Sequence, residues 1–327
     1  MTGFSPPILT KRMATVRTVS LSLAMVVVLI FCLGMDIGEN RALCGGQPYA
    51  RTSISGGSSP YVELTADGIK GPFLLDYGAT RSSLSAAAFP GPLGSIRTAA
   101  ISLPGIKSAD FHLARYDLLF QPEKGQLGVI GVDLLSRFTV QLTQSTAYLG
   151  AEPCRPETLE ASGLTPIAQN GFFSSDPTRL NTGRPNVPVA FLRLGEVRAW
   201  AQIDTGYEDF LRGHSIDINQ ALFDRLLKSR IKLDRLRDVE VWTCDGRERR
   251  TVYRVETAPL VIEDEQAKPI LTTQDFHLIV KPANACGGIA DFSEPAAQLG
   301  ASFLRLFSTV IFDPEAETVW LGRPDDP

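Results

Sequence analysis

The chain has 327 residues, of which 44% are hydrophobic and 21% charged, and its formal net charge is -4 at pH 7. Its 28 glycines and 22 prolines suit a β-rich fold with many turns, and the composition is that of an ordinary globular protein. The sequence contains no basic stripe and no polybasic patch. These features exclude nucleic acid and an anionic membrane surface as partners of the folded part.

The first forty-odd residues have the pattern of a secretory signal. Lys11, Arg12 and Arg17 precede a mostly apolar stretch, residues 21–35. Its length of about fifteen residues is short of the roughly twenty that span a bilayer, so we favour a cleaved signal, with an uncleaved membrane anchor as the alternative. We therefore assign residues 1–46 to a signal peptide or N-terminal anchor and expect an extracytoplasmic protein: periplasmic, secreted or membrane-anchored.

An apolar run in the first half of the chain ends at residues 76–78, Asp-Tyr-Gly, and a second apolar run ends at residues 204–206, Asp-Thr-Gly. A carboxylate that closes a buried strand is costly to desolvate unless it is paired, hydrogen-bonded or used. A single Asp-x-Gly is usually a solvated turn. Two of them behind matching apolar strands point to a functional pair, Asp76 and Asp204.

The duplication extends beyond these triplets. Pro60 and Pro188 each open an alternating segment with a glycine turn, and each acid follows its proline by about 16 residues. This spacing predicts one strand-turn-strand hairpin used twice. Residues 127–142 also resemble residues 299–313, because in both a Gly precedes paired apolar residues and a Phe. The chain is therefore predicted to be a tandem duplication of one mostly β unit.

Other elements follow from local patterns. Residues 82–89 are predicted to form a short helix, and residues 97–120 a hairpin. In the second half, Asp217 is predicted to be the N-cap of a helix that ends near Arg230. Residues 238–262 read as a further hairpin around Asp245 and Gly246, followed by a strand over residues 270–280. The predicted organisation is an N-terminal lobe, residues 47–155, an interlobe linker, residues 156–186, and a C-terminal lobe, residues 187–327.

As a set, the two Asp-x-Gly triplets and the two late apolar-Gly segments resemble the pepsin-like and bacterial retropepsin-like two-lobed aspartic endopeptidases, over roughly residues 58–323. The resemblance implies an all-β, two-lobed acid-protease fold of duplicated, barrel-like lobes with short helices. It further implies that Asp76 and Asp204 share one proton and activate a water for peptide-bond hydrolysis. The dyad-supporting residues it assigns are Gly78, Thr80, Gly131, Thr205, Gly206 and Gly300.

Tyr77 departs from the family pattern in the first lobe, and Tyr207 and Glu208 depart from it in the second, where small or hydroxyl residues are usual after the glycine. Tyr77 stands where the family has a Thr or Ser whose hydroxyl bonds across the lobes, whereas Thr205 keeps that role. Glu208 is expected to add negative charge near the dyad and to raise its pKa. A second hypothesis is therefore a catalytically silent relative that serves as a peptide-binding or structural module of the envelope. A third is a pair of β lobes that binds a small ligand, with the two acids far apart.

Export also decides how the cysteines are interpreted. Cys32 would leave with the signal, and the remaining four allow three pairings in an oxidising compartment. The family resemblance favours Cys244 with Cys286, and Cys44 with Cys154 would bracket the first lobe; four free thiols are the alternative.

The positions of the histidines test whether the chain could be a zinc hydrolase or a serine or cysteine protease. His112, His214 and His277 have no metal-ligand or nucleophile spacing. We expect no metal and no cofactor. The expected partner is a peptide or protein substrate, bound by a monomer, and any membrane contact would come only from an uncleaved N-terminal anchor.

Overall fold

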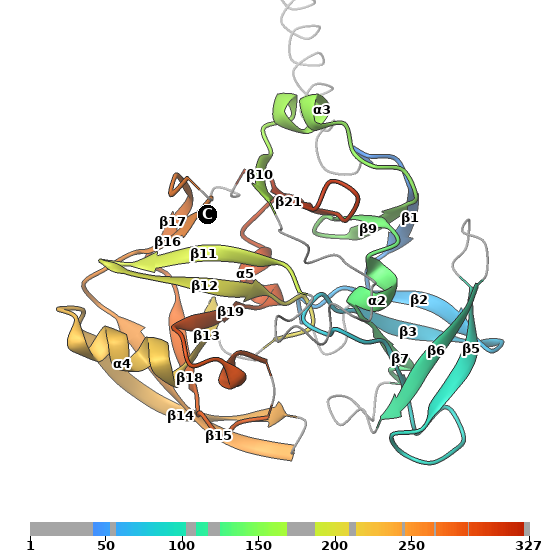
Figure 1. Ribbon diagram of the computed structural model, residues 1–327, viewed down its shortest axis with the longest axis horizontal. Helices are drawn as coiled ribbons and strands as arrows, with labels where there is room; N and C mark the ends of the chain where they lie inside the picture. The colour runs from blue at the N-terminus through green and yellow to red at the C-terminus, as the bar shows by residue number, and fades with distance from the viewer. Residues whose placement is uncertain are drawn as a thin grey trace, which may run out of the picture. The chain divides into compact units, whose positions relative to one another are not determined.

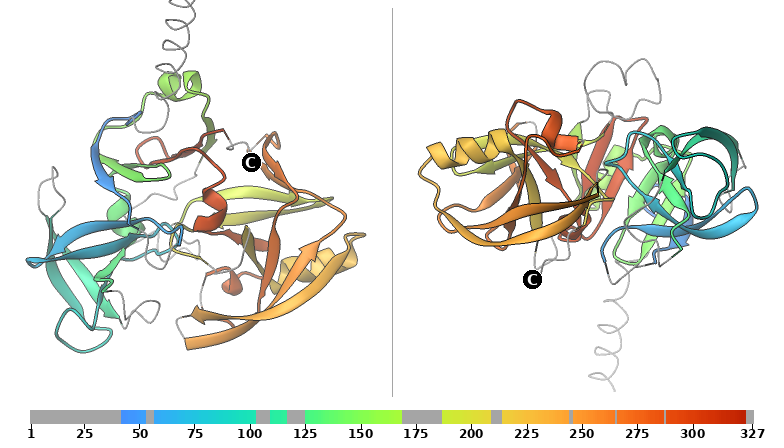
Figure 2. Two further views of the ribbon diagram at one scale, coloured as in Figure 1. Left: turned by 180° about the vertical axis from the view of Figure 1, so that it is seen from behind. Right: turned by 90° about the horizontal axis from the view of Figure 1, so that it is seen from below.

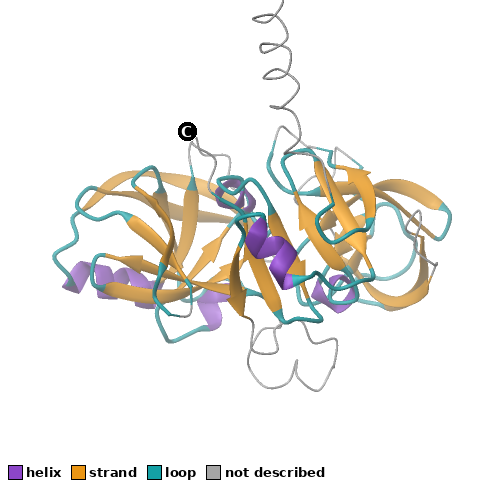
Figure 3. Ribbon diagram, turned by 90° about the horizontal axis from the view of Figure 1, so that it is seen from above, coloured by secondary structure: helices purple, strands orange, loops and turns teal. Residues whose placement is uncertain are grey.

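Strands are the main regular element of the described residues, and the helices among them are few and short (Figure 3). The computed structural model describes residues 42–52, 57–102, 109–116, 125–168, 187–208, 214–243, 246–264, 266–286 and 288–323. They belong to one unit, Ala42–Pro327. Within these ranges no helix is long and apolar enough to cross a membrane, and the predicted signal segment, residues 21–35, lies outside them.

The first lobe is a closed barrel with strand order β2-β3-β7-β4-β6-β5 (Figure 1). The predicted hairpin around Asp67 and Gly68 is present, with Tyr61 opposite Leu74 and Ala66 opposite Ile69. The barrel closes where β5 pairs with β2. The two strands of the β5–β6 hairpin also pair with other strands, β5 with β2 and β6 with β4, so neither lies at a sheet edge. The strands are β2 (Tyr61–Ala66), β3 (Ile69–Leu75), β4 (Ser83–Ser85), β5 (Ile96–Ser102), β6 (Ala109–Tyr116) and β7 (Gly128–Ile130).

The second lobe is a nine-stranded sheet with order β14-β15-β18-β13-β19-β12-β11-β16-β17. Its strands are β11 (Val189–Leu194), β12 (Val197–Ile203), β13 (Ser215–Asn219), β14 (Leu233–Thr243), β15 (Gly246–Val255), β16 (Leu260–Glu263), β17 (Pro269–Thr273), β18 (His277–Lys281) and β19 (Ala296–Leu299). The predicted hairpins are β11 with β12 and β14 with β15. The strand expected over residues 270–280 is divided into β17 and β18.

The two lobes repeat one pairing pattern. β3 pairs in parallel with β7 as β12 does with β19, and β4 pairs with β6 and β7 as β13 does with β18 and β19. In the second lobe β14, β16 and β17 are added at the two ends of this common order, so the sheet stays open. The predicted fold class, an all-β and two-lobed acid-protease fold built by duplication, is confirmed.

A six-stranded sheet joins the two halves, with order β1-β9-β8-β20-β21-β10. Its strands are β1 (Gln47–Ala50), β8 (Thr139–Leu142), β9 (Thr146–Gly150), β10 (Thr165–Ala168), β20 (Val310–Asp313) and β21 (Thr318–Leu321). β8 and β20 pair at its centre, with Val140 opposite Phe312. β10 lies within the predicted linker, residues 156–186, of which residues 169–186 are outside the described part.

The helices are α2 (Val132–Leu135), α3 (Pro156–Ala161), α4 (Gln220–Lys228), α5 (Ala301–Leu304) and the 3-10 helix η3 (Gly288–Asp291). The prediction of a helix over residues 82–89 is wrong, because β4 is held there by pairing with β6 and β7. The predicted N-cap is also wrong. Asp217 lies in β13, and α4 is capped by Asn219, whose Oδ1 accepts a hydrogen bond from the Leu222 N–H (2.9 Å).

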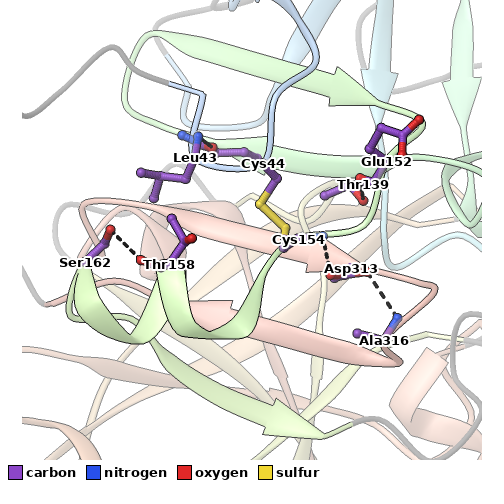
Figure 4. Close-up of a disulfide and its surroundings, with 10 residues drawn as sticks. Leu43, Cys44, Thr139, Glu152, Cys154, Thr158, Ser162, Asp313 and Ala316 are labelled. Carbon is purple, nitrogen blue, oxygen red and sulfur yellow. Dashed lines mark hydrogen bonds between the residues drawn. A yellow bond between two sulfur atoms is a disulfide. The ribbon is translucent and has the colours of Figure 1, made fainter.

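The predicted disulfide between Cys44 and Cys154 is present and closes the first lobe across 110 residues (Figure 4). A loop of this length removes roughly 4–5 kcal/mol of chain entropy from the unfolded state. The Cys154 N–H donates to Asp313 at the end of β20 (3.0 Å), so the bridge is tied to the central sheet. Cys286 is also disulfide-bonded, and its predicted partner, Cys244, lies outside the described residues.

Candidate active site

The two Asp-x-Gly loops begin at equivalent strand ends and meet between the lobes (Figures 1 and 2). Asp76 directly follows β3, and its N–H donates to the Ile130 carbonyl of β7 (2.9 Å). Asp204 directly follows β12, and its N–H donates to the Leu299 carbonyl of β19 (2.9 Å). The parallel pairing of the two strands in each lobe therefore fixes where its acid leaves the sheet.

Each carboxylate is held by the backbone of its own loop. Oδ1 of Asp76 accepts from the N–H groups of Gly78 (2.8 Å) and Ala79 (3.1 Å). Oδ1 of Asp204 accepts from those of Gly206 and Tyr207, both at 2.8 Å. The two acids thus have the same orientation relative to their loops, as a duplicated pair requires.

The loops also pack reciprocally against one another. A Cβ on Gly78 would overlap the Asp204 carboxyl, and a Cβ on Gly206 would overlap the Asp76 carboxyl. Only glycine leaves the space that the partner's carboxyl occupies. The side chains of Asp76 and Asp204 are hydrogen-bonded to each other as a result.

Two later glycines, Gly131 and Gly300, pack against the loops from behind. A Cβ on Gly131 would lie 2.7 Å from the Ala79 carbonyl oxygen, and one on Gly300 would lie 2.7 Å from that of Tyr207. The next residue in each case donates its N–H to the same oxygen, both at 2.8 Å. Each glycine therefore allows the start of a short helix, α2 or α5, to press against an Asp loop.

The cross-lobe support differs between the loops. Thr205, which is buried, donates its hydroxyl to the Leu75 carbonyl (2.6 Å) and accepts from the Tyr77 N–H (2.9 Å). The Tyr77 side chain points elsewhere: its ring, 0% exposed, stacks on Phe312 with ring centroids 3.6 Å apart. The half of the support that a first-lobe hydroxyl would supply is thus replaced by an aromatic contact to the central sheet.

Glu208 connects the second loop to the first lobe. Its carboxylate accepts from the N–H groups of Ser58 (2.5 Å) and Ser59 (3.2 Å), just before β2. Arg305 donates to the Ser58 hydroxyl (3.1 Å) from the end of α5. Burial, Glu208 and Asp76 together raise the pKa of Tyr61 to about 12, and Glu208 also opposes the lowering of the Arg51 pKa by burial.

Burial sets the acid–base state of the dyad. Burial, the charge of Asp204 and the hydrogen bond between the two acids raise the pKa of Asp76 well above its usual range, against the two backbone N–H donors. Burial also raises the pKa of Asp204, and hydrogen bonds from Asp76, Tyr207, Gly206 and Gln298 oppose this rise. The pair therefore does not readily hold two negative charges.

The structure brings Asp76, Asp204, Gly78, Gly206, Thr205, Gly131 and Gly300 together. Thr80 is half-buried in the first loop, and the described hydrogen bonds to Asp76 come from Gly78 and Ala79 instead. Within the described ranges no group of three His, Cys, Asp or Glu side chains is arranged to hold a metal ion.

One residue with a direct contact to the dyad was missed as a functional residue. Gln298 in β19 donates its side-chain amide to Oδ2 of Asp204. A signal for it was present in the sequence, because aligning the two late segments places Gln298 opposite Val129 of the first lobe. A polar residue inside an otherwise apolar strand calls for a partner.

Comparisons with known proteins add a modest amount. No protein-family model and no curated protein sequence matches the chain. Several solved structures are similar to it, including the three that follow. The aspartic proteinase from Irpex lacteus has a TM-score of 0.43 at 11% identity, over 86% of this chain and 98% of that protein. Basic 7S globulin from soybean has a TM-score of 0.42 at 10% identity, over 84% and 93%.

The third is the crystal structure of edgp, with a TM-score of 0.46 at 10% identity, over 88% of this chain and 96% of that one. Similarity of this degree says nothing about activity. The fold assignment rests on the duplicated strand order and on the paired Asp loops.

Proposed function

We propose that this chain is an extracytoplasmic aspartic endopeptidase whose Asp76 and Asp204 activate a water for hydrolysis of peptide bonds. The observation that carries the proposal is the reciprocal packing of the two loops, in which each glycine makes room for the other loop's carboxyl. A solvated Asp-x-Gly turn has no need of this arrangement. Both acids also have a raised pKa, which is common at catalytic sites.

The chemistry follows from one proton shared by two acids. The ionised carboxylate takes a proton from water as the water oxygen attacks the carbonyl carbon of the peptide. The protonated carboxyl gives its proton to the carbonyl oxygen, so that a neutral diol forms and the pair again holds one proton. Asp76 is partly exposed, which leaves the pair open to a substrate.

The cysteines support the location. A disulfide between Cys44 and Cys154, together with the disulfide-bonded Cys286, suits an oxidising compartment outside the cytoplasm.

An unfolded protein or peptide is the substrate class that such a site would take, and extended backbone is the form it would bind.

The test is hydrolysis of casein by the purified protein, compared with Asp76→Asn and Asp204→Asn. Each substitution should lower kcat by roughly 10²–10⁴-fold, the contribution of general acid–base catalysis. Asp224→Asn, on the exposed face of α4, is the matched control and should keep full activity. Equal activity of wild type and both dyad variants would contradict the proposal.

A second candidate is a peptide-binding module without hydrolysis. The first loop favours it, because Tyr77 stands where the family has a Thr or Ser and its ring stacks on Phe312. A pepstatin-type peptide would separate the two functions. Binding that is lost in Asp76→Asn supports the enzyme, and peptide binding unchanged in both Asp variants, with no hydrolysis by wild type, supports the module.

A further inference from the structure

The second lobe places buried polar side chains where the first lobe has apolar ones. Strand register shows the equivalence: Leu74 pairs with Val129 in the first lobe, and Gln202 pairs with Gln298 in the second. In each lobe these positions precede the catalytic Asp and the late glycine by two residues. Gln202 and Gln298 are 3% and 8% exposed, so both amides are inside the protein.

Gln298 makes the two carboxyls of the dyad unequal. Its amide donates to Oδ2 of Asp204, while the N–H groups of Gly206 and Tyr207 occupy Oδ1. Asp204 therefore has three donors besides its partner acid. Asp76 has two, both from its own backbone, and the apolar Val129 stands where the third would come from.

The charged groups around Asp204 come from several strands. Lys281, on β18, is 6% exposed, and Asp204 opposes the lowering of its pKa by burial. Its Nζ and the Gln298 Oε1 would lie 3.2 and 3.7 Å from a Cβ on Gly288. The ammonium group and the side-chain oxygen of Gln298 therefore both lie beside Gly288.

The remaining charges near Gln298 are largely compensated. Asp217, on β13, is the cross-strand partner of Gln298. It forms an ion pair with Arg250 of β15 and accepts the Tyr207 hydroxyl (2.7 Å). On the first-lobe side, Asp204 is hydrogen-bonded to Asp76, whose charge also acts on Tyr61 of β2. Lys281 is a nearby cation that favours an ionised Asp204.

We propose that Gln298 is a positioning residue that places the negative charge of the dyad on Asp204 and leaves the shared proton on Asp76. This inference rests on the proposed protease function and assigns its two roles. Asp204 is the base that takes a proton from water, and Asp76 is the acid that protonates the carbonyl oxygen.

The assignment predicts an asymmetric effect on the pH profile. A donor to ionised Asp204 stabilises both the singly and the doubly ionised dyad, so it lowers only the first of the two macroscopic pKa values. In Gln298→Val, which copies Val129, the acid limb of kcat/KM should move up by about one pH unit, the size expected for loss of one hydrogen bond to a charged group. The basic limb should stay in place.

Two variants control this experiment. Gln202→Val removes the neighbouring buried amide, which among the described contacts makes no hydrogen bond to Asp204, and should leave the acid limb unmoved. Gln298→Met removes the amide at nearly constant length and replaces the valine variant if that one does not fold. An unmoved acid limb in both Gln298 variants, or an equal shift in Gln202→Val, overturns the proposal.

A titration that needs no activity separates this inference from the proposed function. Carbon-13 NMR of the Asp carboxyl groups, assigned with Asp76→Asn and Asp204→Asn, should show Asp204 ionising first in wild type and at higher pH in Gln298→Val. That result without casein hydrolysis would leave the inference standing and remove the protease. Hydrolysis with Asp76 ionising first would keep the protease and overturn the inference.

Discussion

The two Asp loops share one backbone and differ in their side chains. In both, the Asp N–H bonds to the strand paired in parallel, two loop N–H groups bind Oδ1, and a late glycine presses from behind. The residue after the Asp differs: Thr205 bonds across the lobes, whereas Tyr77 stacks on Phe312. Strand pairing and glycine packing therefore set the loop geometry. The hydroxyl after the Asp can be lost from one loop where another contact holds the lobes together.

The loops differ again four residues after each Asp. Thr80 lies half-buried in the first loop, whereas Glu208 at the equivalent place in the second loop binds the backbone at Ser58 and Ser59. The second loop therefore makes polar contacts to the first lobe through Thr205 and Glu208, and the first loop makes an aromatic contact to Phe312. Substitutions at equivalent positions can test this division.

The largest effect is expected at Tyr77. Tyr77→Thr would give the first loop the family's residue, yet it removes a ring that is fully buried against Phe312. We expect a loss of about 3–5 kcal/mol in the free energy of unfolding, the usual cost of truncating a buried aromatic residue, measured by urea denaturation. Tyr77→Phe keeps the stacked ring and serves as control. A Tyr77→Thr variant as stable as Tyr77→Phe would show that the ring does not hold the lobes.

Thr205→Val should cost less, about 1–3 kcal/mol. The substitution keeps the shape and leaves the Tyr77 N–H and the Leu75 carbonyl, both at buried positions, without the hydroxyl they bond to. Thr205→Ser keeps the hydroxyl and should retain most of the stability. Urea denaturation of the two variants checks this, and a Thr205→Val variant as stable as wild type beside a destabilised Thr205→Ser would show that the methyl group, rather than the hydroxyl, matters.

Glu208→Gln should cost about 1 kcal/mol, because charge-assisted hydrogen bonds to Ser58 and Ser59 become neutral ones at a partly exposed site. Thr80→Val, the matched change in the first loop, should stay within about 0.5 kcal/mol of wild type. Thermal unfolding at low and high salt measures both. If the Thr80 variant loses as much stability as the Glu208 variant, the two loops do not differ in the way proposed.

The smallest effect is expected when one carboxyl of the dyad is removed, which should raise the free energy of unfolding at neutral pH. The pKa of Asp76 is raised in the folded state. At low pH the folded and the unfolded protein both hold its proton, so the group then costs no folding stability. As pH rises past the unfolded value of about 3.9, the unfolded state ionises first and stability is lost until the folded pKa is reached.

Asp76→Asn should therefore be more stable than wild type at pH 7, by roughly 0.5–1 kcal/mol, and equal to it at pH 3. Asp204→Asn should gain less, because more donors hold its carboxylate. Denaturation at the two pH values measures the difference, and a gain that is the same at pH 3 would point to a cause other than ionisation.

Much of the site could be predicted from the sequence because it repeats. The hairpins that lead to Asp76 and Asp204 and the late glycines Gly131 and Gly300 follow from local patterns or from the duplication. A single hydrophobic run that ends in an acid and a glycine is usually a solvated turn, and its recurrence behind a matching strand argues against that interpretation.

The errors arose where long-range pairing overrides local preference. Residues 83–85 have no strong strand signal, and they form β4 because β6 and β7 pair with them in the barrel. Asp217 looks like a helix cap in its local context. Its ion-pair partner, Arg250, comes from another strand 33 residues away, and this pairing allows the carboxylate to be buried in β13.

The sequence by itself thus determined the duplicated β architecture and the identity of the two acids, because strand periodicity, glycine loops and their repetition are local properties of the chain. Only the tertiary structure decided how the acids are held and made unequal. The contacts of Tyr77 with Phe312, Glu208 with Ser58, and Gln298 with Asp204 join residues more than 90 positions apart. Such contacts depend on strand register and lobe packing, which no local pattern records.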